Sequence, residues 1–94
     1  MPHRYQEGLE KTKELLRELS KPELEAVLEA AGLSPQKAKI IFLKYIPEQR
    51  RWFIAEEVHC AETKVSVKTT QALLKLKHYF EFTGRIRDGN IVRT

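Results

Sequence analysis

Apolar residues recur every three or four positions over most of the chain, which is the spacing of one face of an α-helix. Short breaks that contain Pro, Gly or Ser divide this pattern into separate segments. The pattern predicts five helices, over residues 5–19, 22–31, 35–46, 52–59 and 63–82. We therefore expect a mainly α fold.

Three boundaries between these segments carry strong local signals. Ser20 opens the run Ser-Lys-Pro-Glu, a capping-box pattern with proline in the first turn, and predicts the start of the second helix. Gly32 and Gly84 follow the second and the fifth helix, where glycine readily adopts the left-handed conformation that ends a helix. The helices are therefore expected to be separate elements joined by short turns.

From residue 83 onward the periodicity changes from helical spacing to alternation. The dipeptide Asp88-Gly89 lies between two short alternating runs, which is a strong signal for a β-hairpin. With these two residues in the loop, Ile86 is opposite Ile91, and both side chains share the face that packs on a core. We expect a short C-terminal hairpin, and a flexible tail is the alternative.

The net charge of +4 is unevenly distributed along the chain. Residues 1–62 carry ten Lys and Arg against eleven Asp and Glu, whereas residues 63–94 carry seven against two. A basic segment beside a nearly neutral one is typical of a nucleic-acid-binding protein. The same charges also fit a solvated helix whose lysine stems cover apolar surface.

Length and composition narrow the class of protein further. Ninety-four residues form one domain. No apolar run approaches the roughly 20 residues that cross a bilayer, and the first residues lack the apolar region of a secretion signal. The single cysteine, Cys60, cannot form an internal disulfide. We therefore expect a cytoplasmic protein without a membrane segment.

Catalytic and metal-binding patterns are weak in this sequence. His59, Cys60 and His78 do not supply the four closely spaced ligands of a structural zinc site. Cys60 with His78 lacks a glycine-rich oxyanion loop and an orienting acid, and no phosphate-binding glycine motif is present. We expect no enzymatic activity, no metal and no cofactor.

The most informative stretch is residues 54–65. A helix-turn-helix requires a small residue inside its first helix, because the second helix crosses close to it, and an apolar residue early in the second helix. Ala55 and Val65 meet these two requirements. Trp52, at the start of the first of these helices, is expected to anchor the core or a hinge rather than to stack on bases.

The run Ile54-Ala55-Glu56-Glu57-Val58 resembles the first helix of the helix-turn-helix motif of DNA-binding proteins. The layout of residues 34–80 is similar to the promoter-reading region four of bacterial sigma factors and to phage regulators built on it. This resemblance implies a small transcription regulator that binds double-stranded DNA. The chain departs from the motif at the turn, where His59 stands in place of the usual glycine.

The C-terminal segment resembles the end of a winged-helix domain, in which a hairpin follows a basic helix. That resemblance implies that Arg85 and Arg87 lie on the phosphate backbone of DNA. The alternative is that these arginines keep the edge of a hairpin soluble.

The second helix of the motif is expected to meet base edges with the face opposite its apolar stripe, and its flanks to meet phosphates. Gln pairs with adenine, Lys with guanine, and a Val methyl contacts thymine. The predicted DNA-binding residues are Arg50, Arg51, Thr63, Lys64, Ser66, Val67, Lys68, Thr70, Gln71, Arg85 and Arg87.

A second, weaker apolar stripe runs along this same face through Val67, Leu74, His78 and Phe82. We expect the N-terminal helices to cover its distal part, from Leu74 to Phe82, and to leave the first two turns free. The alternative is that the stripe binds another protein, so that the chain is a helical adaptor without nucleic-acid binding.

The chain is expected to form one domain over residues 1–94, in three parts. Residues 1–33 form a nearly neutral helical pair that offers a surface for a homodimer or for a protein partner such as RNA polymerase. Residues 34–82 form the helix-turn-helix core, and residues 83–94 form the hairpin or a flexible tail.

Overall fold

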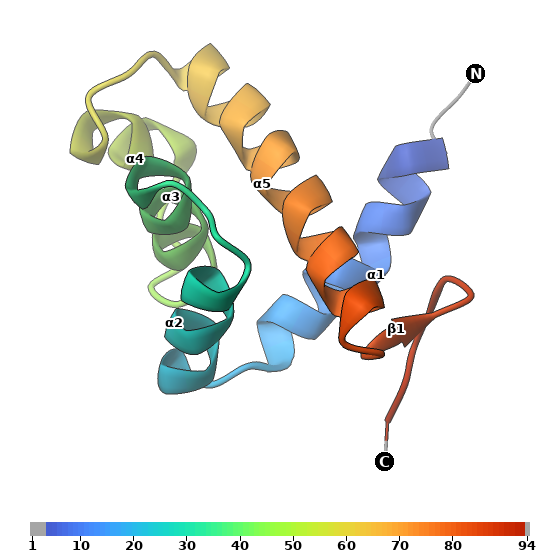
Figure 1. Ribbon diagram of the computed structural model, residues 1–94. Coiled ribbons are helices and arrows are strands. Elements are labelled where there is room, and N and C mark those ends of the chain that lie inside the picture. The colour runs from blue at the N-terminus through green and yellow to red at the C-terminus, as the bar shows by residue number, and fades with distance from the viewer. Residues whose placement is uncertain (1–3, 94) are drawn as a thin grey trace.

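Five helices and a two-stranded hairpin make up the protein, whose computed structural model describes residues 4–93 (Figure 1). The elements are α1 (Arg4–Glu18), α2 (Lys21–Ala30), α3 (Pro35–Tyr45), α4 (Arg51–Glu57), α5 (Glu62–Phe82), β1 (Ile86–Arg87) and β2 (Asn90–Ile91). The predicted mainly α fold with a C-terminal hairpin is confirmed, and the helix ends differ by one or two residues from those expected.

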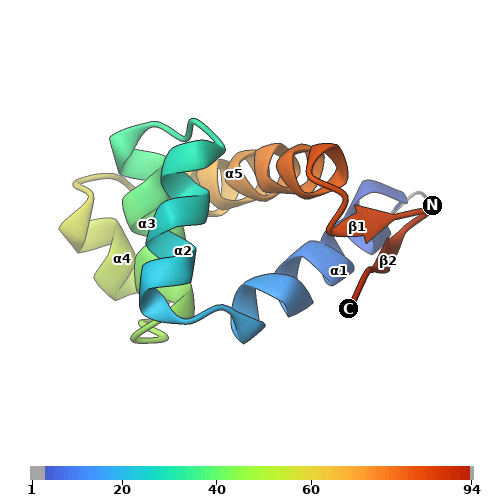
Figure 2. The same ribbon diagram turned by 60° about the horizontal axis from the view of Figure 1, so that its bottom comes forward.

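The long helix α5 connects two halves of a flattened molecule, with extents of 38 × 37 × 20 Å. Its first half packs on α3 and α4, and its second half packs on α1 and the hairpin, so that α1 and α4 lie toward opposite ends of α5 (Figures 1 and 2). Helix α2 packs on α3. Both halves of α5 are therefore held in place by packing against other elements.

Two apolar clusters hold the fold together, and α5 contributes to both. The larger cluster joins α1, α2, α3, α5 and β1, and its most deeply buried residues include Leu16, Leu24, Leu76 and Phe80. The smaller cluster joins α3, α4 and the start of α5, and consists of Ile40, Ile54, Ala55, Val58 and Val65. The buried residues of α5 recur at helical spacing along one face, and they are Val65, Ala72, Leu73, Leu76 and Phe80.

The predicted local signals at the ends of α2 and α5 are present. The backbone N–H of Ser20 donates to Glu23 Oε1 at 2.8 Å, and the backbone N–H of Glu23 donates to Ser20 Oγ at 3.4 Å, which completes the capping box. Gly32 and Gly84 have φ angles of +72° and +82°, in the left-handed region that ends each helix.

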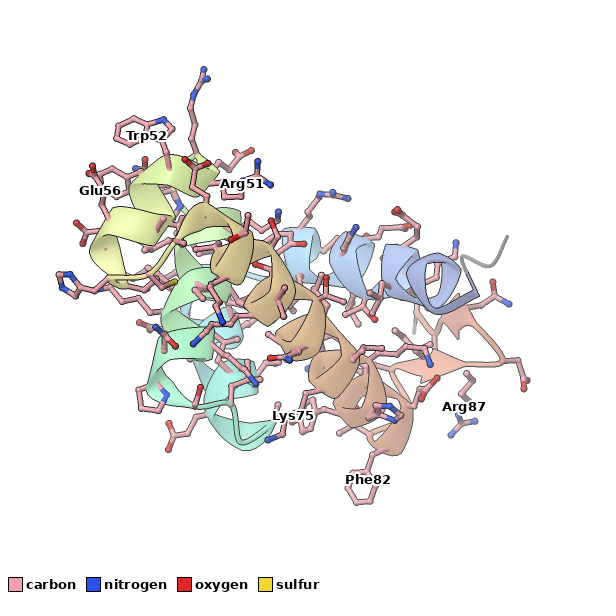
Figure 3. All side chains as sticks on the ribbon, turned by 90° about the horizontal axis from the view of Figure 1, so that it is seen from above. Arg51, Trp52, Glu56, Lys75, Phe82 and Arg87 are labelled. Carbon is pink, nitrogen blue, oxygen red and sulfur yellow. The ribbon has the colours of Figure 1, made fainter. Side chains whose placement is uncertain are left out.

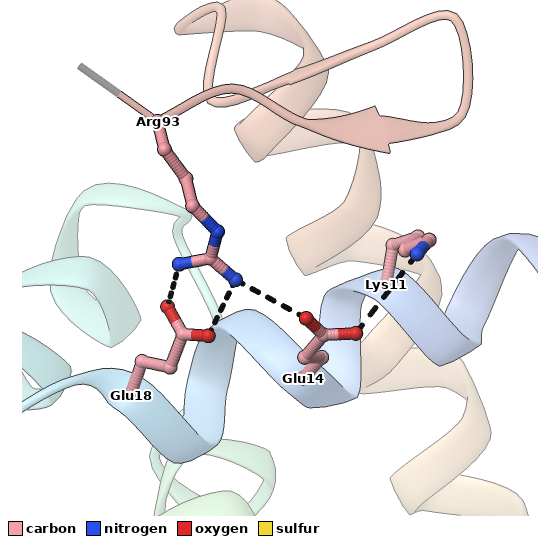
Figure 4. A network of polar contacts seen from close by, with 4 residues as sticks. All are labelled: Lys11, Glu14, Glu18 and Arg93. Atoms are coloured by element: carbon pink, nitrogen blue, oxygen red, sulfur yellow. Dashed lines mark hydrogen bonds and ion pairs between the residues drawn. The ribbon is translucent and has the colours of Figure 1, made fainter.

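The C-terminal hairpin has the predicted register, with Ile86 opposite Ile91. Ile86 is buried in the larger cluster, and Ile91 packs against it. Arg93 then binds α1, because its guanidinium donates to both oxygens of Glu18 at 2.5 and 2.6 Å and to Glu14 at 3.1 Å (Figure 4). This bidentate pairing fastens the end of the chain to the first helix.

Within residues 4–93, no helix combines the length and the apolar character that crossing a bilayer requires.

Candidate nucleic-acid interface

The turn between α4 and α5 is held by hydrogen bonds of the backbone. His59 has a φ of +56°, so it adopts the left-handed conformation usually taken by glycine. The N–H of Cys60 donates to the carbonyl of Ala55 at 3.0 Å, and that of His59 donates to the carbonyl of Glu56 at 3.3 Å. This is the Schellman pattern of a helix end. The turn therefore forms with histidine at the position where glycine is usual.

The two helices of the predicted motif pack through the residues that the sequence singled out. Ala55 is 6% exposed and Val65 is 2% exposed, and both belong to the smaller apolar cluster. Ile40 of α3 packs in the same cluster, so α3 supports the pair from behind. Because interiors are closely packed, a small residue at position 55 lets α5 approach α4. Two helices joined by a short turn, α4 and α5, thus pack on a third helix, α3, that precedes them in the chain.

Polar contacts on one flank fasten the start of α5 to the start of α4. Arg51 donates to the hydroxyl of Ser66 at 2.9 Å and to a carboxylate oxygen of Glu62 at 3.4 Å. Both predicted phosphate-binding residues on this flank, Arg51 and Ser66, therefore contact each other in the free protein. The contact between their side chains connects α4 to α5, and it lies at the surface of the protein.

The other flank of α5 is fastened to α3. Lys68 donates to the side-chain oxygen of Gln36, whose amide nitrogen donates to the carbonyl of Val58 at 3.1 Å. Lys39 donates to the carbonyl of Glu57 at 3.4 Å. Lys68 is thus directed toward α3 and held there, and it does not stand on the outward face with the other predicted residues.

The outward face of the first three turns of α5 carries Thr63, Lys64, Val67 and Gln71, and all four are exposed. Val67 has 53% of its surface exposed. Thr70 is half-buried beside them, and its hydroxyl donates to the carbonyl of Ser66 at 3.2 Å. The structure therefore brings together four of the predicted residues on a free face.

The expected cover over the distal part of this face is missing at its far end. Leu74 is half-buried against the larger cluster, but His78 is exposed and Phe82 has 88% of its surface exposed (Figure 3). The N-terminal helix α1 packs instead on the opposite side of α5, where Leu76 and Phe80 are buried. The expectation that the N-terminal helices cover this stripe from Leu74 to Phe82 was therefore wrong at His78 and Phe82, because α1 follows the stronger of the two apolar stripes.

The remaining predicted arginines lie at the two ends of α5. Arg50 is exposed just before α4, near the start of α5. Arg85 and Arg87 are exposed in the hairpin beyond the last turn of α5. A helix of 21 residues is about 30 Å long. Arg85 and Arg87 are therefore about one helix length from Thr63, and the structure does not bring them together with the other predicted residues.

The position of Trp52 corrects another expectation. Its side chain is 52% exposed and projects from the start of α4, with its ring edge-on to Phe53 at a centroid distance of 6.0 Å (Figure 3). The inner face of α4 is already filled by Ile54, Ala55 and Val58. Trp52 therefore lies at the surface beside Arg51, and does not anchor the core.

Two cations near this site were not identified from the sequence. Lys13 of α1 and Lys44 of α3 line the same groove as Arg51 and Ser66. Both come from the part of the chain with no excess of basic residues, so no charge pattern pointed to them.

The residues considered for metal binding are separated in space. His59 and Cys60 lie in the turn before α5, and His78 lies near its far end. Across the described part of the chain, no group of three or more His, Cys, Asp or Glu side chains is arranged to hold a metal ion.

Comparison of the chain with protein-family models, with curated proteins and with solved structures gave no match.

Proposed function

We propose that this protein binds duplex DNA by placing the first turns of α5 in the major groove, and that it acts as a small transcription regulator. The observation that carries the proposal is the exposed row of Thr63, Lys64, Val67 and Gln71 on a helix whose opposite face is fixed on α3 and α4. The major groove is about 12 Å wide and admits a helix with its side chains. A rigidly held, outward-facing helix of this kind is suited to that groove.

The side chains on this face match the chemistry of base edges. Gln71 can form two hydrogen bonds with adenine, Lys64 can donate to guanine, and the methyl groups of Val67 can contact thymine. Arg50 and Arg51, at the start of α4, stand where the phosphate backbone would pass. Phosphate contacts position a protein on DNA, and base contacts give it sequence preference.

The number of cations at this face sets the expected salt dependence. If Arg50, Arg51 and Lys64 each neutralise one phosphate, a plot of the logarithm of affinity against the logarithm of salt concentration has a slope of about −2.7. The dissociation constant should then rise about 40-fold between 50 and 200 mM NaCl. This can be measured by fluorescence anisotropy of a labelled mixed-sequence duplex.

The matched variants are Lys64→Gln and Lys75→Gln, which remove the same charge from the same helix. Lys75 donates to the carbonyl of Gly32 at 2.9 Å and is therefore turned toward the α2–α3 turn. Lys64→Gln should weaken binding and reduce the salt slope by about 1, whereas Lys75→Gln should change neither. No binding of the unaltered protein at 50 mM NaCl, or equal losses in the two variants, would contradict the proposal.

A second candidate function is that of a helical adaptor that binds another protein. It is favoured by the exposure of Phe82 and Val67 along one line of α5. Retention on a heparin column separates the two candidates, because an adaptor with solubilising lysines should elute at low salt. Replacing Phe82 with Ser should leave DNA affinity unchanged under the first candidate function.

A further inference from the structure

A groove of about 550 Å³ runs between α1, the end of α3 and the starts of α4 and α5. Its cationic wall consists of Lys13, Lys44 and Arg51, which come from three different helices. A second hollow of about 410 Å³ shares Lys44 with the groove, and is lined also by Arg17, Tyr45 and Glu48. Four cations are thus gathered around one place on the surface.

Carboxylates only partly balance these cations. Glu10 lies 3.9 Å from Lys13, Glu62 lies 3.4 Å from Arg51, and Glu48 lines the second hollow with Lys44 and Arg17. Lys44 forms no ion pair with any residue in the range 9–93. Burial and the positive charges of Lys13, Arg17 and Arg51 lower the pKa of Lys44. The neighbourhood of Lys44 is therefore electropositive and favours an anion.

A neutral donor is also available in the groove. The hydroxyl of Ser66 lines the groove and accepts from Arg51, so its own proton is free to donate. Tyr45 lines the second hollow, but its hydroxyl is buried, with no hydrogen-bond partner among the described residues. The neutral donor that an anion in the groove can reach is therefore Ser66.

We propose that the groove is a phosphate-binding site, in which Lys13, Lys44 and Arg51 hold the oxygens of a diphosphate-like group. Lysine and arginine are the residues that bind phosphates most strongly, through charge-assisted hydrogen bonds. The groove, at about 550 Å³, has room for more than one phosphate group. Such a group occurs in a free polyphosphate or nucleotide and, as successive phosphodiesters, in the backbone of a nucleic acid. The site does not depend on the proposed binding of DNA.

The test is titration of the protein with sodium pyrophosphate in low-salt buffer, measured by calorimetry and by the fluorescence of Trp52. The matched variants are Lys44→Gln and Lys37→Gln, because both lysines lie on α3 and only Lys44 lines the groove. Loss of one charge-assisted hydrogen bond should weaken pyrophosphate binding about tenfold in Lys44→Gln and in Lys13→Gln. Lys37→Gln should bind as the unaltered protein does, and the melting temperature of each variant verifies that it is folded.

The outcomes are distinct. A loss of more than fivefold in Lys44→Gln and Lys13→Gln but not in Lys37→Gln supports the site. Absence of saturable binding at millimolar pyrophosphate overturns the proposal. A loss of affinity below fivefold in Lys44→Gln and Lys13→Gln, or an equal loss in Lys37→Gln, also overturns it. Unlabelled duplex then identifies the natural source of the phosphates. Competition with pyrophosphate assigns the site to a nucleic-acid backbone, and simultaneous binding assigns it to a free anion; both results require the site to exist.

Discussion

Replacing His59 with glycine should stabilise the protein, and this change tests the turn that positions α5. His59 has a φ of +56°, and an L-residue with a Cβ pays for this left-handed conformation with about 1–2 kcal/mol. Its side chain is exposed and forms no hydrogen bond within the described part of the chain, so its removal loses no contact of that kind. The backbone hydrogen bonds of the turn remain available to glycine.

The gain is reduced by the greater freedom of glycine in the unfolded chain, by about 0.4–1 kcal/mol. The net increase in the free energy of unfolding is therefore about 0.5–1 kcal/mol. For a domain of this size, 1 kcal/mol corresponds to about 4–8 °C, so the melting temperature should rise by about 2–8 °C. Thermal unfolding followed by circular dichroism measures this directly.

The control is the same replacement at His78, which is exposed in the interior of α5. There glycine is a poorer helix former than histidine, so His78→Gly should lower stability by about 0.3–0.5 kcal/mol. His59→Ala retains the Cβ and should leave the melting temperature nearly unchanged. If His59→Gly lowers the melting temperature as His78→Gly does, the turn does not hold residue 59 in the left-handed conformation, and the geometry described for the motif is incorrect.

Two further changes test other parts of the fold. Ala55→Leu adds volume where α5 crosses α4, so it should lower the free energy of unfolding by about 1–3 kcal/mol in a denaturant titration. The control Glu56→Leu lies on the exposed side of α4 and should not lower it. Equal effects of the two changes would contradict the close crossing of the helices. Hydrogen bonds from Arg93 lower the pKa of Glu18, so the stabilisation from this carboxylate is complete above its ordinary pKa near about 4.3 and is lost as the pH falls through the lower folded value. Glu18→Gln should therefore flatten the acid side of a plot of melting temperature against pH, and an unaltered acid limb would show that the pairing seen in Figure 4 does not stabilise the protein.

The elements that could be predicted from the sequence are those with local causes. The register of the hairpin follows from Asp88-Gly89, since the turn type fixes which residues are opposite. The buried stripe of α5 follows from the helical spacing of its apolar residues, since the stronger of its two apolar rows is the one that faces the core. The left-handed conformation of residue 59 could not be predicted from the sequence, because histidine, unlike glycine, does not indicate a left-handed turn.

The features that could not be predicted depend on contacts between helices that are far apart in the sequence. Periodicity indicates that a face is apolar but not which neighbour covers it, so Phe82 was wrongly expected to lie beneath the N-terminal helices. Trp52 was wrongly expected to anchor the core for a related reason. The sequence shows that its ring is hydrophobic, but not that other side chains already occupy the inner face of α4. The cationic groove combines Lys13 and Lys44, which are distant in a sequence segment with no excess positive charge. Charge counted along the chain cannot detect such a cluster.

The outward face of α5 and the cationic groove are linked through Arg51. This residue lines the groove and also donates to Glu62 and Ser66 at the start of α5, directly beside the exposed Lys64. A phosphate group in the groove would compete with Glu62 for the guanidinium of Arg51. If the occupant is the backbone of the duplex, the two surfaces form one interface. The groove then binds the phosphates of one strand on the flank of α5, while the outward face of α5 contacts the bases. If the occupant is a free anion, Arg51 binds that anion, and the phosphate contacts of the duplex are left to Arg50 and Lys64, so that the anion and the duplex bind at the same time.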